Sequence, residues 1–411
     1  MLSIYEGFFS GGARIVHSDV VMGLQEGGQL HSVLSLNGEM YREATRQRME
    51  DDVCFRSLTG AGIPVTSLGR GHGAPDVVDG FTGPELAATA RAMAGADVIL
   101  SLKEQPLGLL NQAGLPRRPV VVCLHRSDPE NQGPALDELR TAVADGRIAA
   151  AVCCAESTRA AYAAAGIPAE LLHVIPNGVD LLRFRPDHFR RTLLRTSLGV
   201  PAEAPVIVFA ARYAGMKNVP LFLRAARAWL RRHPEGRVLM CGAGMTRANA
   251  GLREDMAAAF GDEAALTDRV ALLGVRDDME VVYAAADVVS LTSSSGEAAP
   301  LSLIEGMMCG AVPVATDVGD CASIVAGHGL LTPLDAEAVA RAWSEAVERR
   351  DEFTPALTLS RERFSRTRMI AAYATLIERV RGGAPQATHP TPDPLPEPLP
   401  EPLPEPLPEP F

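Results

Sequence analysis

The 411-residue sequence lacks several features that would assign it to a specialised class of protein. It has no apolar run of the ~18 residues that a membrane span requires. Its first residues, MLSIYEGFFSGG, have neither the charged start nor the cleavage site of a secretory signal, so we expect a cytoplasmic location. Basic residues number 39 against 50 acidic ones, without the basic stripe typical of a nucleic-acid-binding protein.

Paired cysteine motifs are also absent. None of the seven cysteines belongs to a C-x-x-C pair, the spacing of many redox and zinc sites. An odd number of cysteines in a chain without an export signal predicts reduced thiols. The sequence contains no D-x-D pair of aspartates either, and we expect no metal ion and no cofactor.

Proline is abundant in one place only. Twelve of the 31 prolines follow Gly383, where the repeat PLPE runs to the end of the chain with five acidic residues and no Lys or Arg. Alternating proline prevents a helix or an inner strand. Residues 383–411 are therefore expected to form a disordered, solvated polyproline tail, a spacer rather than a docking arm.

Short apolar runs alternate with helix-length segments along the rest of the chain, a pattern typical of β-α-β units around a buried parallel sheet. In the first half the runs are Leu2–Tyr5, His31–Leu36, Pro64–Leu68, Asp97–Leu102, Pro119–Leu124, Ala149–Cys154 and Leu172–Ile175. In the second half they are Pro205–Ala211, Arg237–Cys241, Arg269–Gly274, Asp287–Thr292, Val312–Thr316 and Gly329–Pro333. The sequence thus predicts an α/β protein of two domains with a cleft between them.

The boundaries follow from breaks in this alternation. We expect a first domain at 1–182, a second at 183–366, a helix at 367–382 and the tail at 383–411. The irregular basic stretch Arg183–Arg195 is interpreted as the domain link and Thr354–Arg366 as irregular. The segment Tyr41–Arg56 mixes arginines with acidic residues, which favours a solvated helix face over a lipid-binding one.

Two glutamates in the second half indicate a ligand site. Glu305 is the only charged residue between Ala298 and Thr316, in a helix pattern opened by Pro300 and closed by Gly310. A lone carboxylate there must reach solvent, find a protein donor or accept hydrogen bonds from a ligand. Glu297 precedes the same helix at its positive end. A salt bridge would explain either residue alone, but the two together favour a site at the carboxyl ends of the strands.

Cations and glycines follow other strands. Arg212 and Lys217 come between an apolar strand and a helix start, where they could neutralise a diphosphate. Gly242 and Gly244 follow the next strand, although Arg247 replaces the third glycine of a dinucleotide fingerprint.

The first half offers a glycine turn and a histidine. Gly11 and Gly12 lie between the first strand and a helix, where bare backbone N–H groups can meet an anion. His125 ends a strand, so a structural role and a ligand role are both open.

The spacing of Glu297 and Glu305, followed by CGAVPVATDVGD, resembles the GT-B-type retaining glycosyltransferases, in the large family that includes sucrose synthase and bacterial mannosyltransferases (glycosyltransferase family four). Arg212, Lys217, the IPNGVD segment and the Gly11-Gly12 turn occur in the expected order, and the resemblance covers about residues 1–381. It implies two Rossmann-like domains facing each other across a cleft, with the last helix crossing back onto the first domain.

The resemblance also implies roles for these residues. Glu305 would bind the ribose and Glu297 the hydroxyls of the donor sugar. Arg212 and Lys217 would neutralise the leaving diphosphate, Gly12 would approach the phosphates, and His125 would contact the transferred sugar. Arg212, Lys217, Glu297 and His125 are thus the implied catalytic residues, and the implied donor site consists of Gly12, Gly242, Gly244, Val275, Glu297, Ala299, Pro300, Leu301 and Glu305.

The expected function is transfer of a sugar from a nucleotide-diphosphate sugar, with UDP favoured, to a soluble hydroxyl acceptor with retention of configuration. A natural product, an aminocyclitol or a saccharide would suit as acceptor. Four alternatives stay open: a glycosidase using the two glutamates, a sugar-nucleotide epimerase, a lipid-directed transferase at the membrane surface, and a scaffold whose tail is the working part.

Overall fold

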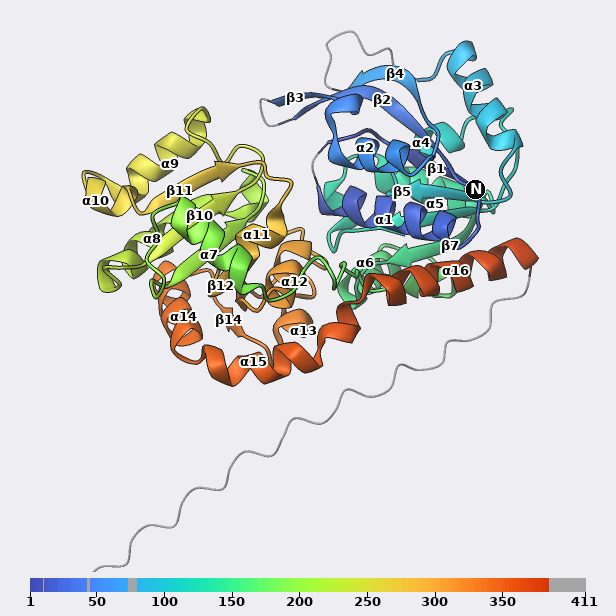
Figure 1. Ribbon diagram of the computed structural model, residues 1–411. Helices are drawn as coiled ribbons and strands as arrows, with labels where there is room; N and C mark the ends of the chain where they lie inside the picture. Colours follow the sequence, from blue (N-terminus) through green and yellow to red (C-terminus); the bar gives the residue numbers. More distant parts are fainter. Residues whose placement is uncertain (10, 43–44, 73–79, 384–411) are drawn as a thin grey trace, which may run out of the picture.

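The computed structural model describes residues 1–9, 11–42, 45–72 and 80–383, so the predicted PLPE tail lies outside the described residues except for Gly383. The chain forms two α/β lobes that lie side by side (Figure 1), as predicted from the alternation. Each lobe has its own sheet and its own buried core.

The N-terminal lobe contains a sheet with the strand order β3-β2-β1-β5-β6-β7-β8, and β4 also pairs with β2. Its strands are β1 (Leu2–Tyr5), β2 (Ser32–Arg42), β3 (Thr45–Arg48), β4 (Val65–His72), β5 (Ile99–Leu102), β6 (Val120–Leu124), β7 (Ile148–Cys153) and β8 (Leu172–Val174). Its helices are α1 (Gly12–Glu26), α2 (Val53–Gly60), α3 (Gly83–Ala94), α4 (Leu107–Leu110), α5 (Ala135–Ala144) and α6 (Glu156–Ala164). Helices α1 and α2 pack on one face of the sheet and α3 to α6 on the other.

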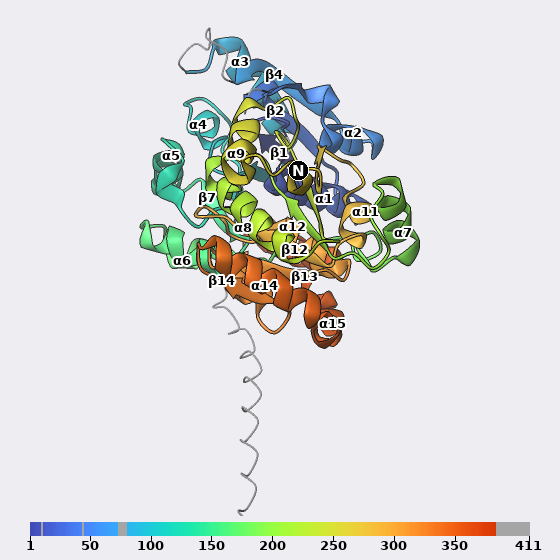
Figure 2. The same cartoon turned by 90° about the vertical axis from the view of Figure 1, so that its left-hand side faces the viewer.

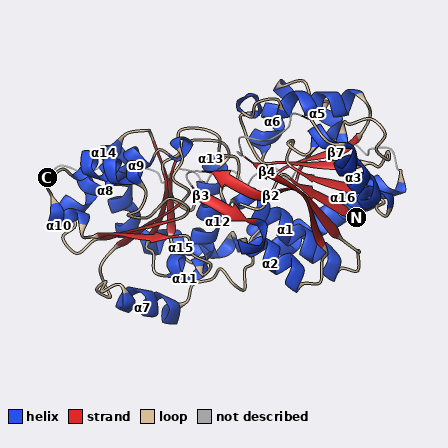
Figure 3. Cartoon of the chain, turned by 90° about the horizontal axis from the view of Figure 1, so that it is seen from above, coloured by secondary structure: helices blue, strands red, loops and turns tan. Residues whose placement is uncertain are grey.

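The C-terminal lobe contains a parallel sheet with the strand order β11-β10-β9-β12-β13-β14. Its strands are β9 (Val206–Ala210), β10 (Arg237–Cys241), β11 (Val270–Gly274), β12 (Val288–Leu291), β13 (Val312–Thr316) and β14 (Leu330–Thr332). Its helices are α7 (His188–Ser197), α8 (Val219–Arg232), α9 (Ala250–Phe260), α10 (Ala264–Thr267), α11 (Met279–Ala284), α12 (Leu301–Met308), α13 (Cys321–Val325), α14 (Ala336–Glu348) and α15 (Arg350–Leu359). Figure 3 shows α8, α9 and α14 on one side of this sheet and α7 and α11 on the other.

The core of the C-terminal lobe is aromatic where α8 meets α14, two helices that run next to each other in Figure 2. Phe222 and Trp229 of α8 are fully buried, and their rings lie 5.1 and 6.3 Å from that of Trp343 on α14. Asn218 caps α8 in the left-handed conformation (φ 50°), with its side chain accepting from the Leu221 N–H. This cap ends the loop that follows β9 and so positions the residues of that loop.

A last helix, α16 (Arg366–Gly382), returns to the N-terminal lobe. Its buried residues Met369, Tyr373 and Leu376 join a core cluster with Val16 and Val20 of α1. Gly178 lies against the start of this helix, since an added Cβ would be 2.5 Å from the Ser365 carbonyl oxygen. The chain therefore crosses between the lobes twice at one place.

Three local predictions are wrong. Arg183–Arg195 is not an irregular link, because α7 begins at His188 and two of its arginines, Arg191 and Arg195, pair with the buried carboxylate of Asp287, the residue just before β12. Thr354–Arg366 includes the second half of α15, a helix that contains Pro355 and buries Phe353 and Leu357. Tyr41–Arg56 begins as an antiparallel strand pair, β2 with β3, rather than a helix face.

The cysteines agree with the prediction of reduced thiols: all seven are buried and none is in a disulfide. Within the described ranges, no helix is both long and apolar enough to cross a membrane.

Candidate active site

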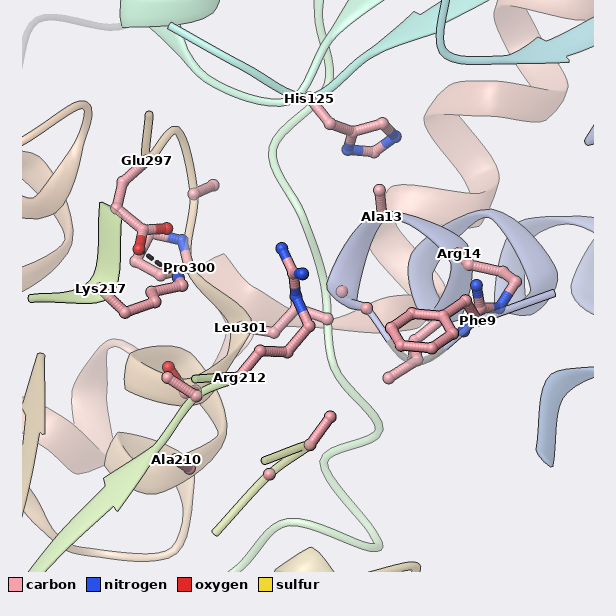
Figure 4. A pocket seen from close by; sticks show the side chains of 18 of the residues that line it. Phe9, Ala13, Arg14, His125, Ala210, Arg212, Lys217, Glu297, Pro300 and Leu301 are labelled. Atoms are coloured by element: carbon pink, nitrogen blue, oxygen red, sulfur yellow. Dashed lines mark hydrogen bonds and ion pairs between the residues drawn. The ribbon is translucent and has the colours of Figure 1, made fainter. Parts of the chain in front are cut away.

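A cleft lies between the lobes, lined by residues that follow strands of both sheets (Figure 4). Charged and glycine residues that follow β1, β5, β6, β9 and β10 line it. The predicted residues that it brings together are Gly12, His125, Arg212, Lys217, Gly242, Val275, Glu297, Ala299, Pro300, Leu301 and Glu305. Ligands of open α/β sheets bind at this edge because connecting loops diverge there.

An ion pair dominates the C-terminal wall of the cleft. Lys217 ends a short 3-10 turn just before the Asn218 cap, and its amine pairs with the carboxylate of Glu297 (Figure 4). The hydroxyl of Ser293 donates to Oε1 of Glu297 over 2.6 Å. Glu297 is only 6% exposed, so the two donors compensate the desolvation of its charge. Arg212 follows β9 on the same wall and points into the cleft.

Glu305 lies further along the same wall, on α12. Burial raises the pKa of its carboxyl to about 7, and a hydrogen bond with Tyr283 offsets that rise only in part. The helix begins after Pro300 as predicted and ends at Met308, followed by the C-cap residue Cys309 and by Gly310 with φ 89°. An acid of this kind, half ionised near neutral pH, is typical of a ligand site rather than of a structural ion pair.

Two of the predicted glycines, Gly12 and Gly242, line the cleft. An added Cβ on Gly12 would lie 3.4 Å from Cδ1 of Leu301, so the start of α1 faces the start of α12 across the cleft. Gly242 (φ 129°) would place a Cβ 2.1 Å from the Ala211 carbonyl oxygen, which no side chain can do. Gly244 does not line the cleft; it packs against Tyr213, and the structure therefore does not support its predicted place in the donor site.

His125 directly follows β6 on the N-terminal wall. Burial lowers the pKa of its imidazole to about 3, helped by the positive charge of Lys103, so the ring is neutral at physiological pH. Among the described residues its Nε2 has no hydrogen-bond partner. A neutral ring at a cleft wall can exchange a hydrogen bond with a ligand.

The sequence analysis missed Glu6 and Lys103, which also line the cleft. Each directly follows a buried strand, β1 or β5, as His125 follows β6. The same signal, a polar residue at the carboxyl end of an apolar run, would have found both. Phe9, Arg126, Asn177 and Arg276 line the cleft from loops and carry no such signal.

Polar contacts across the cleft hold the lobes together. The Ser127 hydroxyl donates to the carbonyl oxygen of Glu297, and the Asn177 amide donates to that of Ala299 over 3.0 Å. The carboxylate of Asp320 accepts from the backbone N–H groups of Glu156 and Ser157 over 3.0 and 2.9 Å, and thereby caps α6 of the other lobe. The loop that carries Glu297 is thus fixed by both lobes.

The described part of the chain holds no group of three His, Cys, Asp or Glu side chains placed to bind a metal ion.

Two family models match the two lobes. Residues 11–178 match the glycosyl transferase 4-like domain, and residues 204–349 match the glycosyl transferases group 1. The chain belongs to the GT-B-type glycosyltransferases, as the resemblance of its motifs indicated.

The curated relatives share a name. The D-inositol 3-phosphate glycosyltransferase of Saccharomonospora viridis is 34% identical over 198 residues, which are 44% of this chain and 42% of the relative. That of Corynebacterium kroppenstedtii is 33% identical over 175 residues, 39% of this chain and 38% of the relative. The matches thus span less than half the length of these relatives.

Solved structures share the fold over almost the whole chain. Alr3699/HepE of Anabaena, crystallised in complex with UDP, has a TM-score of 0.75 at 22% identity and covers 92% of this chain and 99% of its own. WaaG, a glycosyltransferase involved in lipopolysaccharide biosynthesis, has a TM-score of 0.64 at 14% identity, covering 92% and 99%. At these identities the likeness establishes the GT-B fold.

Proposed function

We propose that the chain transfers a sugar from a nucleotide-diphosphate sugar to a hydroxyl group of a soluble acceptor, with retention of configuration. The observation that carries this proposal is the placement of Arg212, Lys217, Glu297 and Glu305 on one wall of the cleft, facing the Gly11-Gly12 turn on the other. Two cations, two carboxylates and bare backbone N–H groups match the phosphates and hydroxyls of such a donor.

The chemical task is to break the bond between sugar and diphosphate. Negative charge develops on the leaving diphosphate and needs fixed donors. Arg212 and Lys217 supply positive charge on the C-terminal wall, and the start of α1 at Gly12 supplies N–H groups and the positive end of a helix from the opposite lobe. Because these groups can carry the charge, we propose that turnover needs no metal ion.

The carboxylates hold the donor. Glu305 accepts hydrogen bonds from the ribose hydroxyls, and Glu297 accepts them from the sugar while Lys217 shifts toward the phosphate. Until the donor binds, the ion pair between Lys217 and Glu297 holds both side chains at the donor site and compensates the charge of each. His125, neutral and on the acceptor side, contacts the transferred sugar.

The configuration of the sugar is retained if the acceptor hydroxyl attacks on the same face from which the diphosphate leaves. The leaving diphosphate then takes the proton of that hydroxyl. UDP is the favoured nucleotide, supported by the structural neighbour crystallised with UDP and with UDP-glucose. The acceptor is a cyclitol, natural product or saccharide, in keeping with the relatives named for an inositol phosphate.

A ligand panel tests this proposal. UDP-, GDP- and ADP-sugars are added separately in a thermal-shift assay, where a ligand at 100 times its dissociation constant stabilises by ~2.7 kcal/mol. We expect one nucleotide series to raise the melting temperature and to release nucleoside diphosphate only with an acceptor, also in the presence of EDTA. No response to any nucleotide sugar would contradict the proposal.

The same assay separates the alternatives. A sugar-nucleotide epimerase would change the donor without an acceptor, and a glycosidase would cleave glycosides with Arg212 and Lys217 idle. A lipid-directed transferase would transfer only to acceptors in vesicles. A scaffold would release no nucleoside diphosphate at all.

The pKa of Glu305 gives a pH dependence with a definite sign. Since burial raises that pKa to about 7, the carboxylate that binds ribose forms only as the pH rises through this value. We expect the affinity for UDP-glucose, whose diphosphate does not titrate in this range, to rise about ten-fold from pH 6 to pH 8. Isothermal titration at several pH values measures it. The same shift stabilises the unliganded fold at acid pH, fully below pH 4.5, and this contribution is lost as the pH rises through about 7.

Glu305→Gln is the matched control, because it keeps the size and the hydrogen-bonding side chain but cannot ionise. Its affinity should be lower at pH 8 and flat across the range. An unchanged pH profile in the variant would show that another group titrates.

A further inference from the structure

The carbonyl oxygen of Glu297 is contacted from both lobes. The hydroxyl of Ser127, from the loop that follows β6 in the N-terminal lobe, donates a hydrogen bond to it. Gly319 of the C-terminal lobe also approaches it closely, since an added Cβ would be 2.2 Å from this oxygen. The next peptide is held as well, because the N–H of Asp320 donates to the Ala298 carbonyl over 3.0 Å. The backbone at Glu297 is thus fixed in part by a hydroxyl group of the opposite lobe.

The loop that carries Ser127 is itself braced. The residues on either side of it, Arg126 and Asp128, form a bidentate ion pair with Nε–Oδ1 and Nη2–Oδ2 distances of 2.7 and 2.8 Å. This pair packs against Gly296 of the C-terminal lobe, where an added Cβ would be 2.9 Å from Nη2 of Arg126 and 2.8 Å from Cε of Met216. Gly296 also has a φ of 70°, so a residue with a Cβ is disfavoured there. The two loops thus meet with no room for a side chain between them.

Two further contacts hold the lobes together at the same place. The carboxylate of Asp320 caps α6 of the N-terminal lobe, a helix whose own N-cap residue, Ala155, offers no side-chain acceptor. The amide of Asn177 donates to the Ala299 carbonyl over 3.0 Å. Neither contact involves Ser127, so the loss of its hydroxyl would remove one support of the donor loop while the lobes stay together.

We propose that Ser127 is a positioning residue for the donor sugar. Its hydroxyl fixes the peptide of Glu297 and thereby the direction of the Glu297 carboxylate, which the proposed function assigns to the sugar hydroxyls; the inference rests on that function. Lys217 and Ser293 hold the carboxylate from the C-terminal lobe, and Ser127 supports it from the N-terminal lobe. Because this bond crosses the cleft, binding of the sugar depends on both lobes, whereas binding of the nucleotide does not depend on Ser127.

Binding of the sugar and binding of the nucleotide can be measured separately. Isothermal titration gives the dissociation constants of UDP and of UDP-glucose, or of the corresponding pair from the nucleotide series that binds best, for the wild type and Ser127→Ala. We expect UDP to bind equally to both proteins. UDP-glucose should bind about 3- to 10-fold more weakly to the variant, the effect of one weakened hydrogen bond at the sugar. In turnover, kcat should fall roughly 10- to 100-fold, because a catalytic group is misplaced.

Two variants separate positioning from a general structural role. Ser127→Thr keeps the hydroxyl and should restore most of the affinity for UDP-glucose. Ser157→Ala is the matched control, because it removes a hydroxyl at the same contact between the lobes that has no hydrogen-bond partner among the described residues. This control should bind UDP and UDP-glucose as the wild type does.

A double-mutant cycle tests whether Ser127 acts through Glu297. If it does, Ser127→Ala should have little further effect on the dissociation constant of UDP-glucose in the Glu297→Gln background, because the carboxylate that it positions is gone. Two residues that act independently would instead have additive effects.

Three results would overturn the inference while leaving the proposed function intact. They are an unchanged affinity of Ser127→Ala for UDP-glucose, an equal loss of affinity for UDP and UDP-glucose, and additive effects in the cycle. Equal binding of UDP by the wild type and Ser127→Ala also shows that the variant is folded. Failure of the proposed function itself would appear as absence of nucleotide-sugar binding by the wild type, and would refute the role of Ser127 with it.

Discussion

Replacing Lys217 by alanine is expected to lower kcat by about 100-fold or more, the usual effect of removing one fixed donor from a developing negative charge. Lys217 lies just before the start of α8. Its side chain is 15% exposed and paired with Glu297, so water or another cation cannot readily take its place. Release of nucleoside diphosphate at saturating donor and acceptor measures the loss. Donor affinity should fall much less, because the interaction strengthens as the bond breaks.

The control for this variant is Arg231→Ala on α8, the helix that follows Lys217. Arg231 is 53% exposed and pairs with Glu263 at the surface, so its removal takes away one positive charge without touching the cleft. Turnover of this control should equal that of the wild type. Near-normal turnover of Lys217→Ala, with a folded protein by circular dichroism, would refute the assigned role.

Replacing Asp287 by alanine is expected to destabilise the C-terminal lobe by about 3 to 5 kcal/mol. The carboxylate is 6% exposed and accepts hydrogen bonds from Arg191, Arg195 and Arg350 over 2.7, 2.8 and 2.8 Å, and from the Val206 N–H over 2.8 Å. Its removal leaves Arg195, itself 3% exposed, without a counter-charge. Urea unfolding of the two proteins measures the difference in the free energy of unfolding.

Glu263→Ala is the matched control for Asp287→Ala. Glu263 also joins two arginines, Arg227 and Arg231, but at the surface, where solvent screens the charges. We expect a much smaller loss than for Asp287→Ala. Equal losses for the two variants would mean that burial does not decide the strength of the Asp287 cluster.

Several elements could be predicted because burial alone imposes their pattern. The strands β9 and β13 are buried along almost their whole length, and such strands have uninterrupted apolar runs. Helix α8 begins where the sequence indicates a helix start, just after Lys217, and its apolar residues recur on one face. Helix α7 was missed, because two of its inward-facing residues are arginines, whose charges are paired by Asp287, more than 90 residues away in the sequence.

The residues of the candidate site also fall into two groups: those that the sequence indicated and those whose surroundings only the fold shows. Arg212, Glu297, Glu305 and His125 could be found because polar residues beside buried strands and helices have few structural explanations. Lys103 follows β5 with the same signal, but its strained φ depends on bonds to Cys123 and Ser101. Gly244 was misplaced, since only the fold shows that it faces Tyr213 instead of the cleft.

The sequence by itself determined two buried, mainly parallel sheets, their main strand runs and the residues at the carboxyl ends, because apolar burial and local charge are properties of short segments. The tertiary structure alone decided how these ends meet. Ser127 reaches the Glu297 carbonyl and Asp320 caps α6 across more than 160 residues of chain, and such pairings leave no local pattern. The absence of long apolar runs and of paired cysteines agreed with the described fold, in which no helix could span a membrane and all seven thiols are free.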